Sequence, residues 1–213
     1  MIKKEYIVSK FFKEIVWNFP DREKELFLTF DDGPTSGITE WVLSVLKEYN
    51  AKATFFCKGE NVEKNPTLYK QIITEGHSIG NHGYSHLKGW NTINEKYFQD
   101  VRKASENINS NLFRPPYGRI KPSQIKQLKK EFEIIMWDVL TRDYNRNLKK
   151  ETCLKRTLHS VKSGSIIVFH DTIKAERNLK YVLPEVLKYY SAKGYQFNSI
   201  EYLDSSSFKQ KSI

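Results

Sequence analysis

The chain alternates between short apolar runs and stretches in which apolar side chains recur every three or four residues. Runs rich in strand-forming side chains predict strands over residues 26–30, 53–56, 78–82, 112–114, 133–137, 165–169 and 195–197. Helical spacing of apolar positions predicts helices over residues 38–49, 66–73, 93–109, 123–130, 151–161 and 179–193. Strand and helix therefore follow one another along nearly the whole sequence.

This alternation predicts a parallel sheet, because parallel neighbours need crossover connections that helices usually provide. Six or seven such units favour an α/β fold, a distorted or incomplete (β/α) barrel with about seven parallel strands. A doubly wound open sheet is the alternative. In both folds, residues that follow the strands meet at the carboxyl edge of the sheet. We expect one catalytic domain over residues 26–200, with an extension (1–25) packed on it and a C-terminal tail (201–213).

Composition agrees with one folded domain, since 39% of the 213 residues are hydrophobic and 28% are charged. The formal charge of +10 comes from 35 basic residues scattered among 25 acidic ones, without a long basic run. We interpret the excess as a feature of solubility or substrate attraction. Nucleic-acid binding is not expected, because basic and aromatic residues do not cluster together.

The first 25 residues predict neither a secretion signal nor a membrane span, because charged residues interrupt every apolar piece. The expected location is the cytoplasm, unless a leader was removed. Cys57 and Cys153 lie far apart in the sequence and match no metal-binding spacing, so their pairing is left open. A monomer is expected.

The first strand stops at two adjacent carboxylates, Asp31 and Asp32, and Gly33 and Pro34 then force a turn. Successive strand residues point to opposite faces, so the two acids project differently from one corner. They could divide two tasks, one holding a metal ion and the other moving a proton. A solvated turn is the alternative, because Asp, Gly and Pro are common turn formers.

His82 and His86 are four residues apart. On a helical turn both imidazoles would reach one cation. Gly83 stands where a metalloprotease of this spacing carries its general-base Glu, which excludes that class. Asp31 and Asp32 are suitable sources of a third ligand and a base. Two incidental surface histidines are the alternative.

Two further strands end in residues suited to acid–base chemistry. Arg114 precedes two prolines, whose rigidity could fix a guanidinium that keeps a carboxylate ionised and oriented. His170 follows a buried run and is well placed to donate a proton to a leaving group. A carboxylate from residues 137–144 could pair with this imidazole and favour its charged form. The alternatives are a structural Arg at a rigid turn and a structural His.

Four motifs occur in the order found in one family: TFDDGP at 29–34, H-x-x-x-H at 82–86, RPPYG at 114–118 and VFHD at 168–171. Over residues 26–197 the chain resembles the polysaccharide deacetylases, the NodB-homology group of carbohydrate esterases (family 4). The resemblance implies a distorted (β/α) barrel. It also implies metal-dependent hydrolysis of N-acetyl, occasionally O-acetyl, groups on polymers or oligomers containing N-acetylglucosamine. Zn²⁺ is the expected ion, with Co²⁺, Mn²⁺ or Ni²⁺ as alternatives.

The resemblance also implies a role for each matching position. Asp31 resembles the catalytic base, and Arg114 the residue that orients it. The expected metal ligands are Asp32, His82 and His86.

The remaining roles fall on three residues of the last two motifs and the stretch between them. The backbone N–H of Tyr117 resembles an oxyanion donor. His170 resembles the general acid, and Asp143 the carboxylate that tunes it.

Four positions depart from the family pattern. The family usually has Ser or Thr at Gly83, Asp at Leu140, Trp at Tyr144 and Leu at Val168. The acid, base and metal set is intact, so activity is expected. The altered stretch around Leu140 and Tyr144 leaves a carbohydrate-binding pseudoenzyme as one alternative. A metal-dependent hydrolase of another amide or ester is a second alternative, because fold and substrate are only loosely tied.

Overall fold

The computed structural model of the protein describes residues 15–201. Its strands form one sheet in the order β1-β6-β5-β4-β3-β2-β8-β7, with β9 beside β2, and every ladder between them is parallel. The strands are β1 (Ile15–Val16), β2 (Glu25–Asp31), β3 (Ala53–Cys57), β4 (Ser78–Asn81), β5 (Leu112–Phe113), β6 (Glu133–Ile135), β7 (Val139–Leu140), β8 (Ile166–His170) and β9 (Gln196–Phe197). Because β1 and β7 are the two ends of this order, the barrel is incomplete, as predicted.

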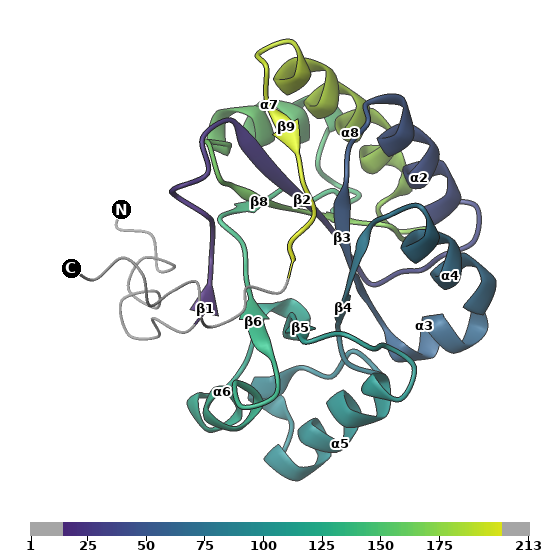
Figure 1. Cartoon of the computed structure of the whole chain (residues 1–213), viewed down its shortest axis with the longest axis vertical. Coiled ribbons are helices and arrows are strands. Elements are labelled where there is room, and N and C mark those ends of the chain that lie inside the picture. The colour runs from purple at the N-terminus through teal and green to yellow at the C-terminus, as the bar shows by residue number, and fades with distance from the viewer. Residues whose placement is uncertain (1–14, 202–213) are drawn as a thin grey trace.

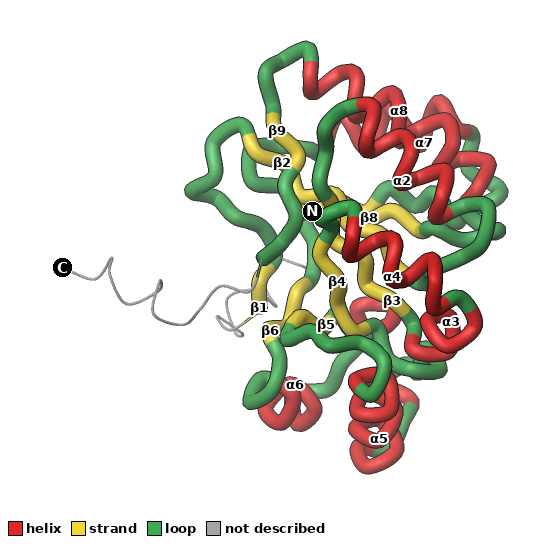
Figure 2. The backbone as a smooth tube through the Cα atoms, turned by 45° about the vertical axis from the view of Figure 1, so that its right-hand side comes forward, coloured by secondary structure: helices red, strands yellow, loops and turns green. Residues whose placement is uncertain are grey.

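Helices pack around the outside of this curved sheet, with α2, α4 and α8 along one side and α5 and α6 beside β5 and β6 (Figures 1 and 2). They are α2 (Thr39–Glu48), α3 (Gly59–Lys64), α4 (Pro66–Thr74), α5 (Asn94–Ser105), α6 (Pro122–Leu128), α7 (Lys150–Ser160) and α8 (Glu176–Ser191). Short 3-10 turns are η1 (Gly89–Asn91) and η2 (Pro116–Gly118). Within the described residues, no helix combines the length and apolarity needed to cross a membrane.

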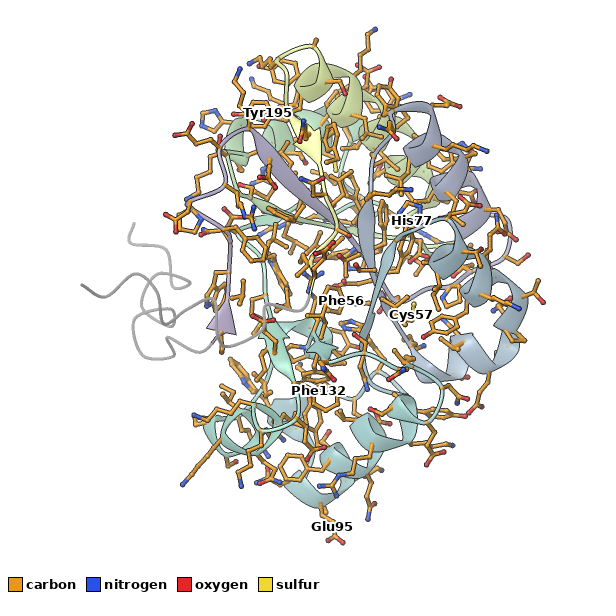
Figure 3. All side chains as sticks on the ribbon, in the orientation of Figure 1. Phe56, Cys57, His77, Glu95, Phe132 and Tyr195 are labelled. Atoms are coloured by element: carbon orange, nitrogen blue, oxygen red, sulfur yellow. The ribbon has the colours of Figure 1, made fainter. Side chains whose placement is uncertain are left out.

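The core lies on both faces of the sheet. Phe56 and Cys57 are neighbours on β3 and belong to different apolar clusters, as the alternation of a strand requires (Figure 3). Phe56 packs with Phe27, Ile135 and other side chains on the concave side. Cys57 packs under the helices. Both cysteines are buried and free, so the question of their pairing is resolved.

Most predicted elements are present, with changes at their ends. Helix α5 stops at Ser105, four residues before the predicted end, and α8 begins at Glu176, three residues before its predicted start. Strands β1 and β7 and helix α3 were not predicted. The two strands have two residues each, too few to display an alternating pattern, and α3 has six.

The predicted division into extension, domain and tail stays a prediction. Residues 1–14 and 202–213 lie outside the described part of the chain, and with them most of the predicted extension and tail. The described end of the extension contributes β1, whose residues pair with Ile134 and Ile135 of β6.

Candidate active site

The carboxyl ends of neighbouring strands bring the predicted residues to one edge of the sheet. Asp31 is the last residue of β2 and His170 the last of β8. His82 directly follows β4, and Arg114 directly follows β5. Because all these strands run in the same direction, the side chains that leave them share one rim.

One atom each from Asp32, His82 and His86 lies within 4.8 Å of the others. Oδ1 of Asp32 is 2.9 Å from Nε2 of His86 and 3.6 Å from Nε2 of His82. This oxygen is buried and accepts no hydrogen bond of good geometry from the described residues. A carboxylate and two imidazoles that converge in this way are a common donor set for a divalent cation, with room for water and substrate.

The protonation states of His82 and Asp32 also suit the binding of a cation. Nδ1 of His82 lies 2.7 Å from the carbonyl oxygen of Arg114 and donates to it, which directs the lone pair of Nε2 toward Asp32. Burial lowers the pKa of His82 to about 4, so this imidazole is neutral near pH 7. Burial alone would raise the pKa of Asp32, but the contact with His86 and the nearby imidazoles hold it well below its usual range. The residues present therefore fit a divalent metal ion.

The two histidines lie on a loop rather than on the helical turn that would make residues four apart neighbours. No helix covers residues 82–88. Gly83 and His86 have φ angles of 74° and 60°, in the left-handed region. The loop folds back at these residues, and this reversal, rather than helical spacing, brings both Nε2 atoms to Asp32.

A carboxylate on α5 holds this loop in place. Asp100 accepts hydrogen bonds from the backbone N–H groups of Tyr84, at 2.9 Å, and Ser85, at 3.0 Å. A Cβ atom at Gly83 would lie 2.9 Å from Oδ2 of Asp100. Asp100 thus fills the space next to Gly83 and steadies the loop where the family pattern has a hydroxyl. Sequence analysis missed Asp100, because nothing in its helix distinguishes it from other surface acids.

Asp31 is held by a buried guanidinium. Nη1 of Arg114 donates to Oδ1 of Asp31 at 2.7 Å and to Oγ1 of Thr29 at 2.7 Å. The other nitrogens of Arg114 donate to the carbonyl oxygens of Ile135 and Met136. Burial lowers the pKa of Arg114, and its ion pair with Asp31 opposes that shift. The arrangement matches the predicted proximity of Arg114 to a carboxylate.

His170 pairs with Asp143, one of the carboxylates of the 137–144 stretch. Nδ1 of His170 is 2.8 Å from Oδ1 of Asp143, and the backbone N–H of His170 donates to Oδ2 at 2.7 Å. Burial lowers the pKa of His170, but Asp143, together with Asp31 and Asp32, outweighs burial and raises it to about 9. The imidazole is therefore protonated near neutral pH, with Nε2–H available as a donor.

Tyr117 lies against His86, one of the candidate metal ligands. Its ring is 4.5 Å from that of His86, and its φ of 61° is uncommon for a bulky residue. Strained backbone of this kind is concentrated at functional sites. The structure thus brings together all eight residues singled out by sequence analysis.

Asp171, the last residue of the VFHD motif, joins two parts of the site. Asp171 is fully buried and accepts hydrogen bonds from the N–H of Gly33, at 3.1 Å, and from the hydroxyl of Thr39, at 2.6 Å. Burial raises its pKa to about 7. These bonds tie β8 to the turn that carries Asp31 and Asp32. No local pattern reveals this role, because its partners lie 132 and 138 residues away.

Comparisons with known proteins agree with the fold and the motifs. The family model described as polysaccharide deacetylase matches residues 19–134. A peptidoglycan-N-acetylglucosamine deacetylase of Bacillus cereus is 34% identical over 197 residues, which cover 89% of this chain and 92% of the relative.

Two solved structures share the architecture. The crystal structure of the Bc1960 peptidoglycan N-acetylglucosamine deacetylase, in complex with 4-naphthalen-1-yl-N-oxidanyl-benzamide, has a TM-score of 0.84 and 33% identity, covering 90% of this chain and 94% of the other. A mutant of BA3943, a CE4 family pseudoenzyme with restored enzymatic activity, has a TM-score of 0.73 and 25% identity, covering 86% and 68%. The second structure shows that this fold also occurs in a pseudoenzyme.

Proposed function

Because the chain belongs to the polysaccharide deacetylase family, we propose that it is a metal-dependent hydrolase of N-acetyl groups on a glycan that contains N-acetylglucosamine. The observation that carries the proposal is the presence of two different proton carriers beside one candidate metal site. Asp31, held by Arg114, and His170, paired with Asp143, are register partners at the ends of adjacent strands, next to Asp32.

Asp32, His82 and His86 would hold the ion, which we propose to be Zn²⁺, with Co²⁺, Mn²⁺ or Ni²⁺ as alternatives. When bound, such an ion polarises an acetyl carbonyl and lowers the pKa of a coordinated water. The neutral imidazole of His82 and the buried oxygen of Asp32, on which both imidazoles converge, support this assignment.

Asp31 acts as the general base that removes a proton from the attacking water. The hydrogen bond that Arg114 donates to this carboxylate fixes its direction. As water adds to the acetyl carbon, negative charge develops on the carbonyl oxygen. The backbone N–H of Tyr117 donates a hydrogen bond to that oxygen.

His170 then protonates the departing nitrogen, so that the C–N bond breaks and acetate and a free amine are released. A protonated imidazole is needed for this step, and the carboxylate of Asp143 favours that form. Asp143 also fixes the ring, because it accepts hydrogen bonds from both the side chain and the backbone of His170.

The substrate is proposed from the relatives. The similar Bacillus cereus protein is a peptidoglycan-N-acetylglucosamine deacetylase, so peptidoglycan is the first glycan to examine. O-Acetyl groups are a second target of the same chemistry. No nucleic acid takes part, and a monomer is sufficient, since every residue named above comes from one chain.

The proposal is tested by measuring acetate release from N-acetylglucosamine oligomers, peptidoglycan and acetylxylan. The enzyme is first stripped of metal and then given Zn²⁺, Co²⁺, Mn²⁺ or Ni²⁺. We expect release from the first two substrates only after metal is restored. Acetate release that is equally fast in the stripped protein would contradict the role of the metal.

A catalytically weakened, carbohydrate-binding pseudoenzyme is the second candidate. It is favoured by the structural similarity to such a protein and by the altered stretch at Leu140 and Tyr144. The same experiment separates the two: a pseudoenzyme would bind metal and glycan without releasing acetate. A hydrolase of another amide or ester would release acid only from other substrates.

A further inference from the structure

A pocket of about 260 Å³ lies beside the pair formed by His170 and Asp143. Asp143 forms part of its wall, together with Arg146, Lys174 and Arg177. Pockets for drug-sized ligands usually measure about 300–1,000 Å³. This pocket is smaller, so it suits one substituent of a larger substrate rather than several sugar rings.

The charges of the pocket are unbalanced. Its three cations, Arg146, Lys174 and Arg177, form no ion pair with any carboxylate in the described part of the chain. Its two acids already have cationic partners. Glu176 pairs with Lys180 at 2.6 Å, and Asp143 pairs with His170 at 2.8 Å. The pocket is therefore positively charged toward an incoming group.

One of the cations is held in place by neutral groups. Nη2 of Arg177 donates to the carbonyl oxygens of Arg146, at 2.9 Å, and Leu148, at 2.8 Å. These bonds restrict the side chain without neutralising its charge. Arg177 lies in the first turn of α8, where the helix dipole adds partial positive charge. A guanidinium oriented in this way favours an anion over a neutral group.

The ring of Tyr144 connects the pocket to His170, the proposed general acid. Nζ of Lys174 lies 5.6 Å from the centre of the Tyr144 ring. The same ring meets His170 edge-on, with centroids 4.8 Å apart. A sugar whose acetamide nitrogen receives a proton from His170 would thus have its neighbour on the chain close to Lys174.

We propose that this pocket binds a carboxylate carried by the glycan, on a sugar adjacent to the one that loses its acetyl group. The substrate class is then an acidic acetylated glycan, such as a peptidoglycan strand whose muramic acid has a free lactyl carboxylate because its stem peptide is absent, rather than neutral chitin. This inference rests on the proposed function. The net charge of +10 would attract such a polymer to the protein.

The test compares two substrates of equal length on the Zn²⁺-loaded enzyme: a neutral N-acetylglucosamine tetramer and a tetramer in which every second sugar carries a lactyl carboxylate. We expect a lower KM for the acidic tetramer. Lys174→Gln and Arg146→Gln should each raise that KM about fivefold, as expected for loss of one partly exposed charge pair. Both should leave kcat/KM for the neutral tetramer within about twofold.

Lys155→Gln is the matched control, since it removes the same charge from an exposed position on α7. It should change neither KM. The preference for the acidic tetramer should also weaken as salt rises from about 0.05 to 0.5 M, because screening shortens the reach of the charges. Equal losses on both tetramers, or equal effects of Lys155→Gln and Lys174→Gln, would overturn the inference.

Failure of the inference is distinguishable from failure of the proposed function. If the neutral tetramer is deacetylated and the acidic one is not preferred, the function stands and the pocket assignment is wrong. If neither tetramer is deacetylated, the proposed function fails for these oligomers. Calorimetric binding of the acidic tetramer to wild type and Lys174→Gln then decides the inference, and equal affinities would refute it.

Discussion

Asp31 and His170 are directly paired in the register of two adjacent parallel strands, β2 and β8. Paired residues of neighbouring strands point to the same face of a sheet, so the candidate base and acid leave the sheet side by side. Asp32, the next residue after Asp31, carries the carboxylate of the candidate metal site. The strand register itself therefore sets the relative positions of base, metal and acid.

Replacing Asp31 by Asn should abolish turnover while preserving metal binding. Asn keeps the size of the side chain and can still accept from Arg114, but it cannot take a proton from water. We expect kcat to fall by about 10²–10⁴, the usual contribution of a general base. Acetate release and bound metal are measured on the same preparation. Normal turnover in Asp31→Asn would exclude Asp31 as the base.

Replacing His82 by Ala should remove both metal and activity. His82 supplies one of the three candidate ligands and is fixed by its hydrogen bond to the Arg114 carbonyl. Elemental analysis should show less metal than in wild type, and added Zn²⁺ should raise the melting temperature of wild type but not of the variant. Exposed His159→Ala on α7 is the control and should retain both properties.

Activity should decline at high pH as His170 loses its proton. Its pKa is raised to about 9, so kcat should fall as the pH rises through that value. Asp143→Asn removes the main group that raises the pKa of His170, so in this variant kcat should begin to fall at a lower pH. If kcat of Asp143→Asn declined over the same pH range as in wild type, a group other than His170 would control the decline.

The raised pKa of His170 also makes the stability of the fold depend on pH. Because the folded-state pKa of His170 exceeds its ordinary value of 6.5, the protonated pair stabilises the fold fully below about pH 6.5. This contribution is lost as the pH rises through about 9. Denaturant unfolding of wild type and Asp143→Asn should therefore differ more at pH 6 than at pH 10.

Replacing Arg114 by Gln should strongly destabilise the protein. Arg114 is completely buried, and its removal leaves the charge of Asp31 without a partner. The expected loss in the free energy of unfolding is about 3–5 kcal/mol. Arg102→Gln is the control, because Arg102 pairs with Glu131 at an exposed site. This substitution should lower the free energy of unfolding by less than about 1 kcal/mol. Similar denaturation midpoints for the two variants would contradict this account.

Serine at position 83 should be harmful in this chain, although the family pattern has Ser or Thr there. The φ of 74° disfavours any L side chain, and its Cβ would approach Asp100 to 2.9 Å. We expect a loss of about 1–3 kcal/mol and weaker metal binding. Gly37→Ser is the control, with a φ of 79° and open space around Cβ. If both variants lose the same stability and bind metal equally, contact with Asp100 is unimportant.

The amino-acid sequence was sufficient to predict the parallel, incomplete barrel and the strand ends that carry the site. Apolar runs and helical spacing are local properties, set by which side chains must leave water within about ten residues. The same holds for the Asp31–Asp32 pair and for Arg114, because Gly33 directly follows the pair and Pro115 directly follows Arg114. The resemblance of the four motifs to those of the family then assigned residues to roles.

Tertiary structure decided the contacts between distant segments. The residue pattern left open which carboxylate of residues 137–144 pairs with His170, and only the family resemblance pointed to Asp143. In the fold, Asp138 bonds instead to Ser165 and the N–H of Ile166, and only Asp143 reaches the imidazole.

The loop conformation at His86, the bonds of Asp100 to that loop and the cationic pocket beside His170 likewise arise from packing. Each joins groups brought close by sheet register and helix docking, and no pattern of neighbouring residues records those distances. The sequence thus determines which groups are available at the strand ends, and packing determines which of them meet.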